Sequence, residues 1–504
     1  MTPIATLRDV ALAHAAKQAD RTFLVAPETA RTLTYGELAR QARLLARYLA
    51  AAGLERGDKV ALYLHNGYQT ALLFLGAIIG GYVVTPLNLL AQRSQLAYIL
   101  EHCDCKVLFT SREYEKQLGE AMTEVRSRMQ IVWIDVDAPE LFREDDLPAA
   151  SMADVAADDP ALLMYTSGTT GVPKGALLTH RNLIAAAQCV AAWHGLTPED
   201  RCLSSLPLYH VNGQVIATVT PFVSGGSVIA PHRFSVSAWW DTVERYEPTW
   251  INLVPTIVSY LVNAADPRRD YSFPGVRFGR CASAPLPPAQ QRSFERTFGI
   301  PVIEAMGMTE TTSVVFANPQ DPAKRKYGSP GVPCGVEARV VDLRSGQTVG
   351  ANVAGEICLR GPNVMRGYYK EPELTAKAFD AEGWLRTGDL GYRDEDGYYF
   401  ITGRLKELII KGGENIAPRE IDEALLRHPA VLEAAAVGIP DPNYGEDILA
   451  CVVLRPGARA SEAELREFCL AELGRYKTPK AFKFIDELPK GPSGKVQRLK
   501  LQQL

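Results

Sequence analysis

Residues 162–182 read LLMYTSGTTGVPKGALLTHRN, and this stretch decides which fold the chain can adopt. It begins with four strand-like apolar residues and ends with Thr179–Asn182, which is typical of the start of a helix. Between them, residues 166–175 hold four hydroxyl side chains, three glycines and one lysine. Glycines let backbone N–H groups approach a ligand closely, hydroxyls add donors, and Lys174 adds positive charge. The loop therefore suits a polyanion such as a phosphate chain.

The loop differs from the common nucleotide-binding pattern GxxxxGK[ST], because Gly175 rather than Ser or Thr follows Lys174. Loops rich in Gly, Ser and Thr are also often plain surface loops. Taken alone, the loop leaves both interpretations open.

Helical and strand-like segments alternate on both sides of this loop. Residues 35–52 place apolar side chains at helical spacing, and Gly53 follows them as a stop signal. Residues 59–64 (KVALYL) then read as a buried strand, and similar strands recur at 82–85, 107–110, 131–134, 227–230 and 250–253. This alternation predicts an α/β fold with largely parallel sheets.

The pattern changes after about residue 335. Short strands separated by turns, at 338–342, 356–360 and 398–401, predict a smaller β-rich subdomain. Helices near 418–427 and 461–473, with strands near 433–438 and 449–454, predict a small C-terminal α+β domain. Residues 402–407 (TGRLKE) place a glycine beside charged side chains, which suits an exposed hinge. We therefore expect an N-terminal domain over 1–403 and a C-terminal domain over 404–504.

The composition excludes several classes of protein. Of the 504 residues, 47% are hydrophobic and 22% are charged, as in average soluble globular proteins. The formal net charge is −4 without a long basic run, which argues against nucleic-acid binding. The nine cysteines lack metal or redox spacing and predict reduced thiols in a cytoplasmic protein. The longest apolar run, residues 71–84, is shorter than the ~18–20 residues that span a bilayer, and the N-terminus lacks a signal-peptide core.

Four further motifs follow the loop along the chain. They are MGMTE at 306–310, TGD at 387–389, TGR at 402–404 and PKGPSGK at 489–495. In this order and spacing, together with the loop, they resemble the adenylate-forming superfamily. That superfamily includes acyl-CoA synthetases, adenylation domains of peptide synthetases and beetle luciferases. The resemblance covers almost the whole chain, from about residue 5 to residue 500.

The resemblance implies a two-step reaction that begins with ATP. A carboxylate attacks the α-phosphate to give an acyl adenylate and pyrophosphate, and a thiol then displaces AMP. By position, Thr309 would contact the α-phosphate, and Glu310 with Thr166 would hold Mg²⁺, a hard cation that prefers oxygen ligands. A Thr-Glu pair can also simply cap a helix. The residues expected to hold the β- and γ-phosphates are Thr166, Ser167, Gly168, Thr169, Thr170 and Lys174.

The nucleoside would contact other segments. Asp389 would accept hydrogen bonds from both ribose hydroxyls, and Arg404 stands where the superfamily also contacts ribose. Ser283, Ala284 and Pro285 would border adenine and the acyl group. Met306 stands where the superfamily often has a tyrosine against adenine, and a thioether covers a purine less rigidly than an aromatic ring.

The C-terminal motifs predict a mobile lid. Lys495, in the tip GPSGK, would bridge the carboxylate and the α-phosphate during adenylation. Lys406 matches the hinge about which the lid would turn between the two half-reactions. Gly412, Gly413 and Glu414 would then line the tunnel for coenzyme A. A lysine of residues 489–495 could also be acetylated, as in the superfamily.

The segments PLYHVNG (207–213) and CASAP (281–285), with residues 304–310, most resemble ligases of small acids, of the oxalyl-CoA and malonyl-CoA synthetase kind. His210 would border the acyl pocket, where it binds a second anionic group or gates the thiol path. Arg233 would hold a distal carboxylate or sulfonate, or else form a surface salt bridge. Plant and fungal oxalate ligases resemble MTEATH around the magnesium-binding glutamate, whereas this chain reads MTETTS at 308–313. This departure argues against oxalate and leaves malonate or sulfoacetate as suitable dianions. Ser313, at the end of this motif, is also expected in the acyl pocket.

Four alternatives stay open at this point. Medium-chain fatty acid or aryl acid ligases match less well. A stand-alone amino-acid adenylation enzyme would need an acidic residue near 249–255, where the chain reads TWINLVP. A luciferase-like oxygenase and an inactive nucleotide-binding relative are weaker, the latter because Lys495, Glu310 and Asp389 are all present. The expected partners are thus a small carboxylic acid, ATP and CoA, without nucleic acid or membrane span, and a homodimer is compatible with them.

Overall fold

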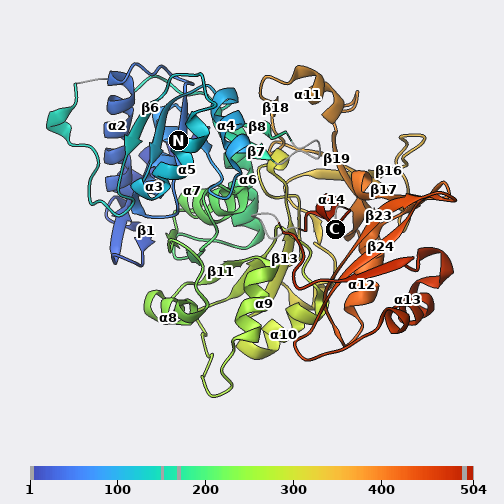
Figure 1. Ribbon diagram of the computed structural model, residues 1–504. Helices are drawn as coiled ribbons and strands as arrows, with labels where there is room; N and C mark the ends of the chain where they lie inside the picture. Colours follow the sequence, from blue (N-terminus) through green and yellow to red (C-terminus); the bar gives the residue numbers. More distant parts are fainter. Residues whose placement is uncertain (1–4, 149–151, 167–171, 491–495, 503–504) are drawn as a thin grey trace. The chain divides into compact units, whose positions relative to one another are not determined.

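The computed structural model describes residues 5–148, 152–166, 172–490 and 496–502 (Figure 1). The described chain divides into two compact units. The first comprises Met1–Glu337 with Arg360–Leu385, and the second comprises Ala338–Leu359 with Arg386–Leu504. Among the described residues, no helix has both the length and the apolar character required to cross a bilayer.

The first unit contains a seven-stranded sheet in the order β18-β8-β7-β4-β3-β5-β6. Its strands are β3 (Lys59–Tyr63), β4 (Val83–Pro86), β5 (Cys105–Thr110), β6 (Gln130–Trp133), β7 (Pro160–Thr166), β8 (Lys174–Thr179) and β18 (Gly367–Tyr368). The strands from β7 to β6 run parallel, whereas β8 and β18 join antiparallel at one edge. The predicted parallel α/β sheet is therefore confirmed, but the sequence did not predict that the loop after β7 returns as β8.

Helices flank this sheet. They are α1 (Leu7–Gln18), α2 (Tyr35–Ala51), α3 (Tyr68–Gly80), α4 (Arg93–His102), α5 (Glu115–Met122), α6 (His180–Trp193) and α11 (Pro372–Ala378). Every residue of α3 is buried, as expected for a helix that is apolar on all sides. Thr179 caps the start of α6 by accepting a hydrogen bond from the Asn182 N–H, so the helix begins where the sequence predicted.

The first unit also contains a nine-stranded sheet in the order β15-β14-β13-β12-β11-β9-β10-β1-β2. Its strands are β1 (Thr22–Ala26), β2 (Arg31–Thr34), β9 (Arg201–Leu203), β10 (Ser227–Ile229), β11 (Trp250–Leu253), β12 (Phe278–Cys281), β13 (Val302–Met306), β14 (Phe316–Ala317) and β15 (Val332–Pro333). The strands from β1 to β13 run parallel, and antiparallel strands close both edges.

Two hydrophobic cores hold this second sheet. On one side α8 (Val236–Tyr246), α9 (Pro255–Asn263) and α10 (Pro288–Phe298) gather along β11 and β13 (Figure 1). Their buried side chains, which include Trp239, Val258 and Phe294, pack with Ile251 and Val302 of the sheet. The π-helix η3 (Asn212–Val219) and α7 (Thr220–Ser224) contribute to the larger core that also contains α3 and α6.

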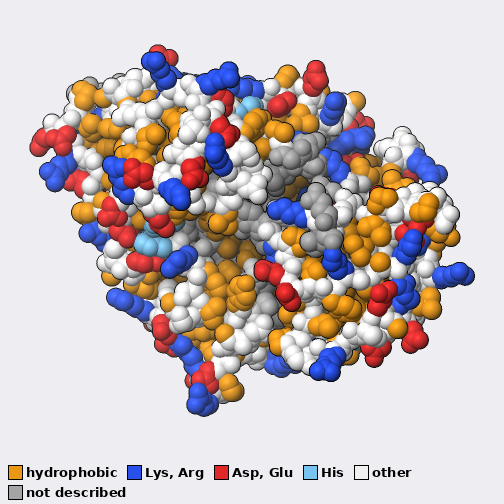
Figure 2. Space-filling view, viewed as in Figure 1, with side chains coloured by type: hydrophobic (Ala, Val, Ile, Leu, Met, Phe, Trp, Pro, Cys, Tyr) orange, Lys and Arg blue, Asp and Glu red, His pale blue; other side chains and the backbone are white. Residues whose placement is uncertain are grey.

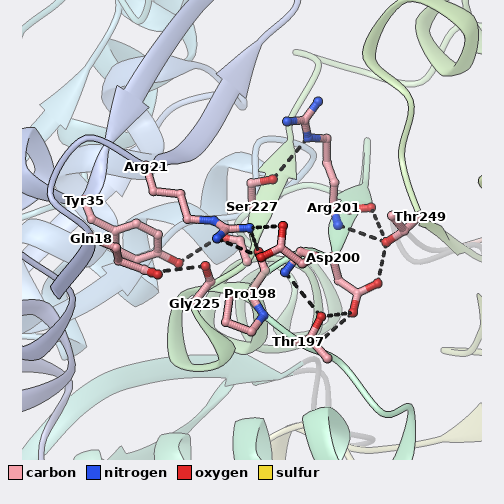
Figure 3. A network of polar contacts seen from close by, with 12 residues as sticks. Gln18, Arg21, Tyr35, Thr197, Pro198, Asp200, Arg201, Gly225, Ser227 and Thr249 are labelled. Atoms are coloured by element: carbon pink, nitrogen blue, oxygen red, sulfur yellow. Dashed lines mark hydrogen bonds and ion pairs between the residues drawn. The ribbon is translucent and has the colours of Figure 1, made fainter.

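A polar network fixes the loop that enters β9 (Figure 3). Asp200 accepts hydrogen bonds from the Thr197 N–H (2.8 Å) and the Thr249 hydroxyl (2.7 Å). The Thr249 hydroxyl also accepts from the Arg201 N–H at 2.9 Å. At the neighbouring turn, the Tyr35 hydroxyl donates to the carbonyl of Gly226 at 2.7 Å. The network thus ties the start of α2 and the entries to β9 and β11 into one scaffold.

The second unit contains two sheets. The first, in the order β16-β17-β19-β20, consists of β16 (Glu337–Val341), β17 (Gly355–Arg360), β19 (Leu385–Arg393) and β20 (Tyr399–Arg404). The second consists of β21 (Ile409–Lys411), β22 (Glu414–Ile416), β23 (Val431–Asp441), β24 (Gly445–Leu454) and β25 (Ala481–Phe484). Its helices are α12 (Pro418–Leu426), α13 (Glu462–Lys477) and α14 (Arg498–Leu501). The β-rich segment 338–359 therefore lies in the same compact unit as residues 386–504, and a functional boundary near residue 404 stays a proposal.

Candidate active site

The ends of the candidate phosphate loop are held by a β-hairpin. Strands β7 and β8 pair antiparallel, with Thr166 directly opposite Lys174. The expected phosphate ligands Ser167, Gly168, Thr169 and Thr170 lie outside the described residues. A Cβ at Gly175 would lie 2.9 Å from Cδ1 of Leu163, so a larger residue there would displace the Leu163 side chain.

Residues 306–310 begin at the last residue of β13 and are all partly exposed. They lead into a short 3-10 helix, η4 (Thr309–Thr311). Gly307 leaves no room for a side chain, because a Cβ would lie 1.0 Å from the carbonyl oxygen of Ser313. Thr312 and Ser313 both have positive φ angles, of 53° and 87°, and the Thr312 hydroxyl donates to the carbonyl of Asn363 at 2.7 Å. A tight, strained turn therefore presents Thr309 and Glu310.

Hydrogen bonds from residues in and just before β18 hold Glu310 in place. The Tyr368 hydroxyl donates a hydrogen bond to Oε1 of Glu310 at 2.9 Å, and the Met365 N–H donates to the Glu310 carbonyl at 2.7 Å. The other carboxylate oxygen has no hydrogen-bond or ion-pair partner among the described residues, so it can bind a hard cation. The described residues contain no group of three or more His, Cys, Asp or Glu side chains that could hold a metal. An Mg²⁺ ion at Glu310 would thus depend on phosphate oxygens and water for its remaining ligands.

Polar side chains gather where β9, β11 and β12 end. The Asn212 amide donates to the Ser283 hydroxyl at 3.0 Å, and the Asn252 amide donates to Oδ1 of Asn212 (3.1 Å) and to the Ser204 hydroxyl (3.3 Å). Oδ1 of Asn252 is buried and has no protein partner among the described residues. Ser283 has a φ of 77°, which is uncommon outside glycine. Ligands of parallel sheets bind at the carboxyl ends of the strands, so this network marks the floor of a polar site.

Sequence reasoning singled out Ser283 but missed Asn212, Asn252 and Ser204. The available signal was a polar residue immediately beyond or within an otherwise apolar buried strand, as in TWINLVP. Ala284 and Pro285 continue from Ser283 and are at least partly exposed.

The other residues predicted for the acyl pocket, His210, Ser313 and Arg233, are less closely connected to one another and to Ser283. His210 is partly exposed in the loop before η3, and its ring lies 4.8 Å from the ring of Tyr209. Ser313 is buried, with 5% of its surface exposed. Arg233 follows β10 and is exposed, and its guanidinium has no hydrogen-bond or ion-pair partner in the described chain. The structure thus does not bring Arg233 into contact with His210 or Ser283.

In the second unit, Asp389 and Arg404 lie opposite each other on β19 and β20. Nε of Arg404 lies 2.9 Å from Oδ1 of Asp389, whose side chain is only 3% exposed. Oδ2 of Asp389 is buried without a partner among the described residues. A buried carboxylate oxygen without a donor is costly unless a ligand or water supplies one. This oxygen therefore fits the hydroxyls of a ribose.

Of the remaining C-terminal candidates, those that the structure describes are surface residues. Lys406 is exposed in the 3-10 helix η6 (Leu405–Glu407). Gly412, Gly413 and Glu414 are exposed at the β21–β22 turn, where both glycines have positive φ angles. Just before them, buried Lys411 lies 2.6 Å from Asp447. Lys495 lies outside the described residues.

Charged side chains of both signs are interspersed over the face that Figure 2 presents. Among the described side chains of this face, Lys and Arg do not form a continuous basic stripe.

Known proteins resemble this chain over its whole length. The family model for AMP-binding enzymes matches residues 12–369, and the model for their C-terminal domain matches residues 420–495. A sulfoacetate–CoA ligase of Cupriavidus necator is 54% identical over 98% of this chain and 97% of that protein. An oxalate–CoA ligase of Arabidopsis thaliana is 36% identical over 90% of both chains. The crystal structure of ATP-bound MatB from Rhodopseudomonas palustris has a TM-score of 0.91 and 31% identity, over 99% of this chain and 98% of that one.

The chain therefore belongs to the family of AMP-binding enzymes, which is the adenylate-forming superfamily that the motifs indicated. Within it, the chain is an AMP-forming acid–CoA ligase.

Proposed function

We propose that this ligase activates a small acid with a second anionic group, of the sulfoacetate type. The observation that carries the proposal is the polar network of Asn212, Asn252, Ser204 and Ser283 at the strand ends. The sulfoacetate–CoA ligase with 54% identity supports the same chemistry.

Because the network makes the pocket floor polar, it favours some of the candidate acids over others. An alkyl chain or aromatic ring placed against this floor would leave the hydroxyl protons of Ser204 and Ser283 without an acceptor, which costs about 1–3 kcal/mol for each. A sulfonate or carboxylate instead accepts hydrogen bonds from them. The hydroxyls of Ser204 and Ser283 each accept an amide hydrogen bond within the network, so each still has its own proton to donate. We therefore place medium-chain and aryl acids second.

In the first half-reaction, the acid carboxylate attacks the α-phosphate of ATP and pyrophosphate leaves. The phosphate loop, with Thr166 and Lys174 at its ends, would bind the β- and γ-phosphates, and Thr309 would bind the α-phosphate. Glu310, with Thr166, would hold Mg²⁺, which when bound neutralises phosphate charge. Lys495 would bridge the carboxylate and the α-phosphate, where negative charge develops in the transition state.

In the second half-reaction, the thiol of coenzyme A attacks the acyl carbon and AMP leaves. Asp389 and Arg404 would hold the ribose through both steps. A turn about Lys406 would replace Lys495 by the Gly412–Gly413–Glu414 turn, which would line the path of the thiol. His210 would border the acyl group, Ser283 would adjoin it, and Ser313 would support the turn behind Glu310. For Arg233, the exposed position favours attraction of the anionic acid from solution over a buried contact.

The assembly and cellular location are further parts of the proposal. All nine cysteines are free thiols, which supports a reducing compartment such as the cytoplasm. A homodimer is tested by light scattering, in which the mass of a single chain would exclude it.

The substrate is tested by measuring AMP formation with ATP, Mg²⁺ and CoA for sulfoacetate, malonate, oxalate, octanoate and benzoate. We expect the highest kcat/KM for sulfoacetate or malonate. A clear preference for octanoate or benzoate contradicts the proposed acid class without affecting the assignment as a ligase.

A further inference from the structure

A buried arginine in β12 has no carboxylate partner among the residues that the structure describes. Arg280 is 1% exposed, and its Nε and Nη1 atoms have no hydrogen-bond partner among the described residues. Burial lowers the pKa of Arg280 to about 10, so the side chain still carries its charge at neutral pH. A buried charge is strongly unfavourable unless an opposite charge lies close by. The charge of Arg280 therefore favours an anion that forms close to it.

Four cysteine thiols interact electrostatically with this guanidinium, those of Cys189, Cys202, Cys281 and Cys334. Cys202 and Cys281 are completely buried, and burial raises the pKa of both thiols, so they keep their protons. Cys189 and Cys334 are the remaining pair in which the charge of Arg280 favours a thiolate.

Cys189 and Cys334 are in direct contact. Their sulfur atoms lie 2.8 Å apart, and a disulfide bond is about 2.05 Å long, so the two are neighbouring thiols. A hydrogen bond from Cys334 lowers the pKa of Cys189, and the charge of Arg280 acts in the same direction. The same hydrogen bond and burial raise the pKa of Cys334. Of the two, Cys189 is therefore the thiol that ionises more readily.

The backbone makes room for this contact. Cys189 lies in α6, and Cys334 directly follows β15, 145 residues later. A Cβ at Gly335 would lie 2.7 Å from Sγ and 2.9 Å from Cβ of Cys189. Gly335 also has a φ of 74°, which favours glycine. Cys189 is partly exposed whereas Cys334 is buried, so a small solute reaches Cys189 first.

We propose that Cys189 and Cys334 form a modification site that peroxides oxidise reversibly to a disulfide, with Arg280 as the counter-charge that activates Cys189. The Cys189 thiolate attacks one oxygen of hydrogen peroxide, the O–O bond breaks, and hydroxide leaves. The sulfur of Cys334 then attacks the sulfur of the resulting sulfenic acid. The S–O bond breaks, the leaving hydroxyl takes the Cys334 proton as water, and the S–S bond forms. Two thiols are oxidised and one peroxide is reduced to two waters, independently of which acid the ligase activates.

Peptide mapping tests the bond directly. The reduced full-length protein is treated with hydrogen peroxide, its remaining thiols are alkylated, and it is digested with trypsin without reductant. We expect a disulfide-linked product of peptides 182–201 and 327–339. Its mass should be two hydrogens less than the sum of the two separate peptides, and dithiothreitol should separate it into them. Cys202 and Cys281, in peptides 202–233 and 281–292, should remain alkylated. Absence of the 182–201 to 327–339 link under these conditions overturns the proposal.

Single variants test the order of the steps. In Cys334→Ser, Cys189 should stop at the sulfenic acid and be trapped by a carbon nucleophile such as dimedone. In Cys189→Ser, Cys334 should stay reduced. Cys202→Ser is the matched control, because it removes an equally buried thiol near Arg280 and should leave the link intact. Oxidation of Cys334 at an unchanged rate in Cys189→Ser contradicts the assigned order.

The role of Arg280 has its own measurement. Alkylation of Cys189 by iodoacetamide at neutral pH should slow about tenfold in Arg280→Met and much less in Arg280→Lys, which keeps a cation. Melting temperature and stabilisation by ATP report whether each variant is folded. If Arg280→Met does not fold, the pH dependence of alkylation in the wild-type protein decides. A midpoint for Cys189 below the ordinary thiol value of about 8.5 supports the counter-charge, and a midpoint at or above it overturns that role.

Discussion

The hydroxyl of Tyr368 donates a 2.9 Å hydrogen bond to the carboxylate of Glu310, and the ammonium of Lys174 lies 5.5 Å from the centre of the same tyrosine ring. One side chain of β18 therefore touches both the end of the phosphate loop and the proposed magnesium ligand. The segment before it is anchored as well, because the Asn182 amide donates to the carbonyls of Pro362 and Val364. Tyr368 thereby fixes the position of Glu310 relative to the β7–β8 hairpin.

Replacing Tyr368 by Phe should weaken the response to magnesium. The ring over Lys174 stays, but Glu310 loses the donor that orients it, and loss of a partner behind a metal ligand typically lowers metal affinity about tenfold or more. We expect the Mg²⁺ concentration for half-maximal ATP–pyrophosphate exchange to rise about tenfold. Stabilisation of the protein by ATP with Mg²⁺, measured by thermal unfolding, should fall in parallel.

The matched control for this prediction is Tyr369→Phe, which removes the neighbouring hydroxyl that donates to Asp104 instead. It should leave the Mg²⁺ dependence unchanged. Equal shifts in both variants would mean that the effect comes from local packing.

Lys495→Ala should impair adenylation selectively. A positioned charge at a developing transition-state charge typically contributes about 10²–10³ in rate, so ATP–pyrophosphate exchange should fall by about 10²-fold. Attack of CoA on preformed acyl adenylate should change much less. Equal losses in the two half-reactions would refute the role of Lys495.

Lys406→Pro should separate the half-reactions in another way. Proline fixes φ near −65° and removes the backbone N–H, so it restricts rotation at η6. We expect one half-reaction to slow markedly more than the other, while Lys406→Ala, which leaves the backbone free, has a small effect. If both half-reactions stay normal in Lys406→Pro, the hinge lies elsewhere.

Asn252→Leu should change the choice of acid. The substitution replaces the centre of the polar floor by a side chain of similar size that cannot hydrogen-bond. We expect kcat/KM for sulfoacetate to fall about tenfold or more, while octanoate and benzoate lose less or improve. An equal loss for all acids, with unchanged melting temperature, would show that Asn252 does not contact the acid.

Buried His180 should make the stability depend on pH. Its Nδ1 accepts a hydrogen bond from the Leu7 N–H at 3.2 Å, and burial lowers its pKa to about 4. In the unfolded chain the histidine pKa is about 6.5, so between these values the unfolded state binds more protons. Stability is therefore complete above about pH 6.5 and falls by up to about 1.4 kcal/mol per pH unit towards pH 4.

His180→Gln keeps an acceptor for the Leu7 N–H but does not titrate. Its unfolding free energy, or its melting temperature, should fall less between pH 7 and pH 5 than that of the wild-type protein. Identical slopes would contradict the assigned pKa.

The sequence by itself determined the parallel α/β strands, the start of α6 at Thr179 and the family of the chain. These features depend on apolar periodicity, capping residues and short motifs, all of which act over a few neighbouring residues. The polar floor depends instead on Asn212, Asn252 and Ser283, which come from three separate segments that meet only when β9, β11 and β12 align. The contact of Tyr368 with Glu310 and that of Cys189 with Cys334 likewise join residues 58 and 145 positions apart. Only the tertiary structure decides such contacts, because long-range packing, and not local preference, determines which strand ends and helix faces become neighbours.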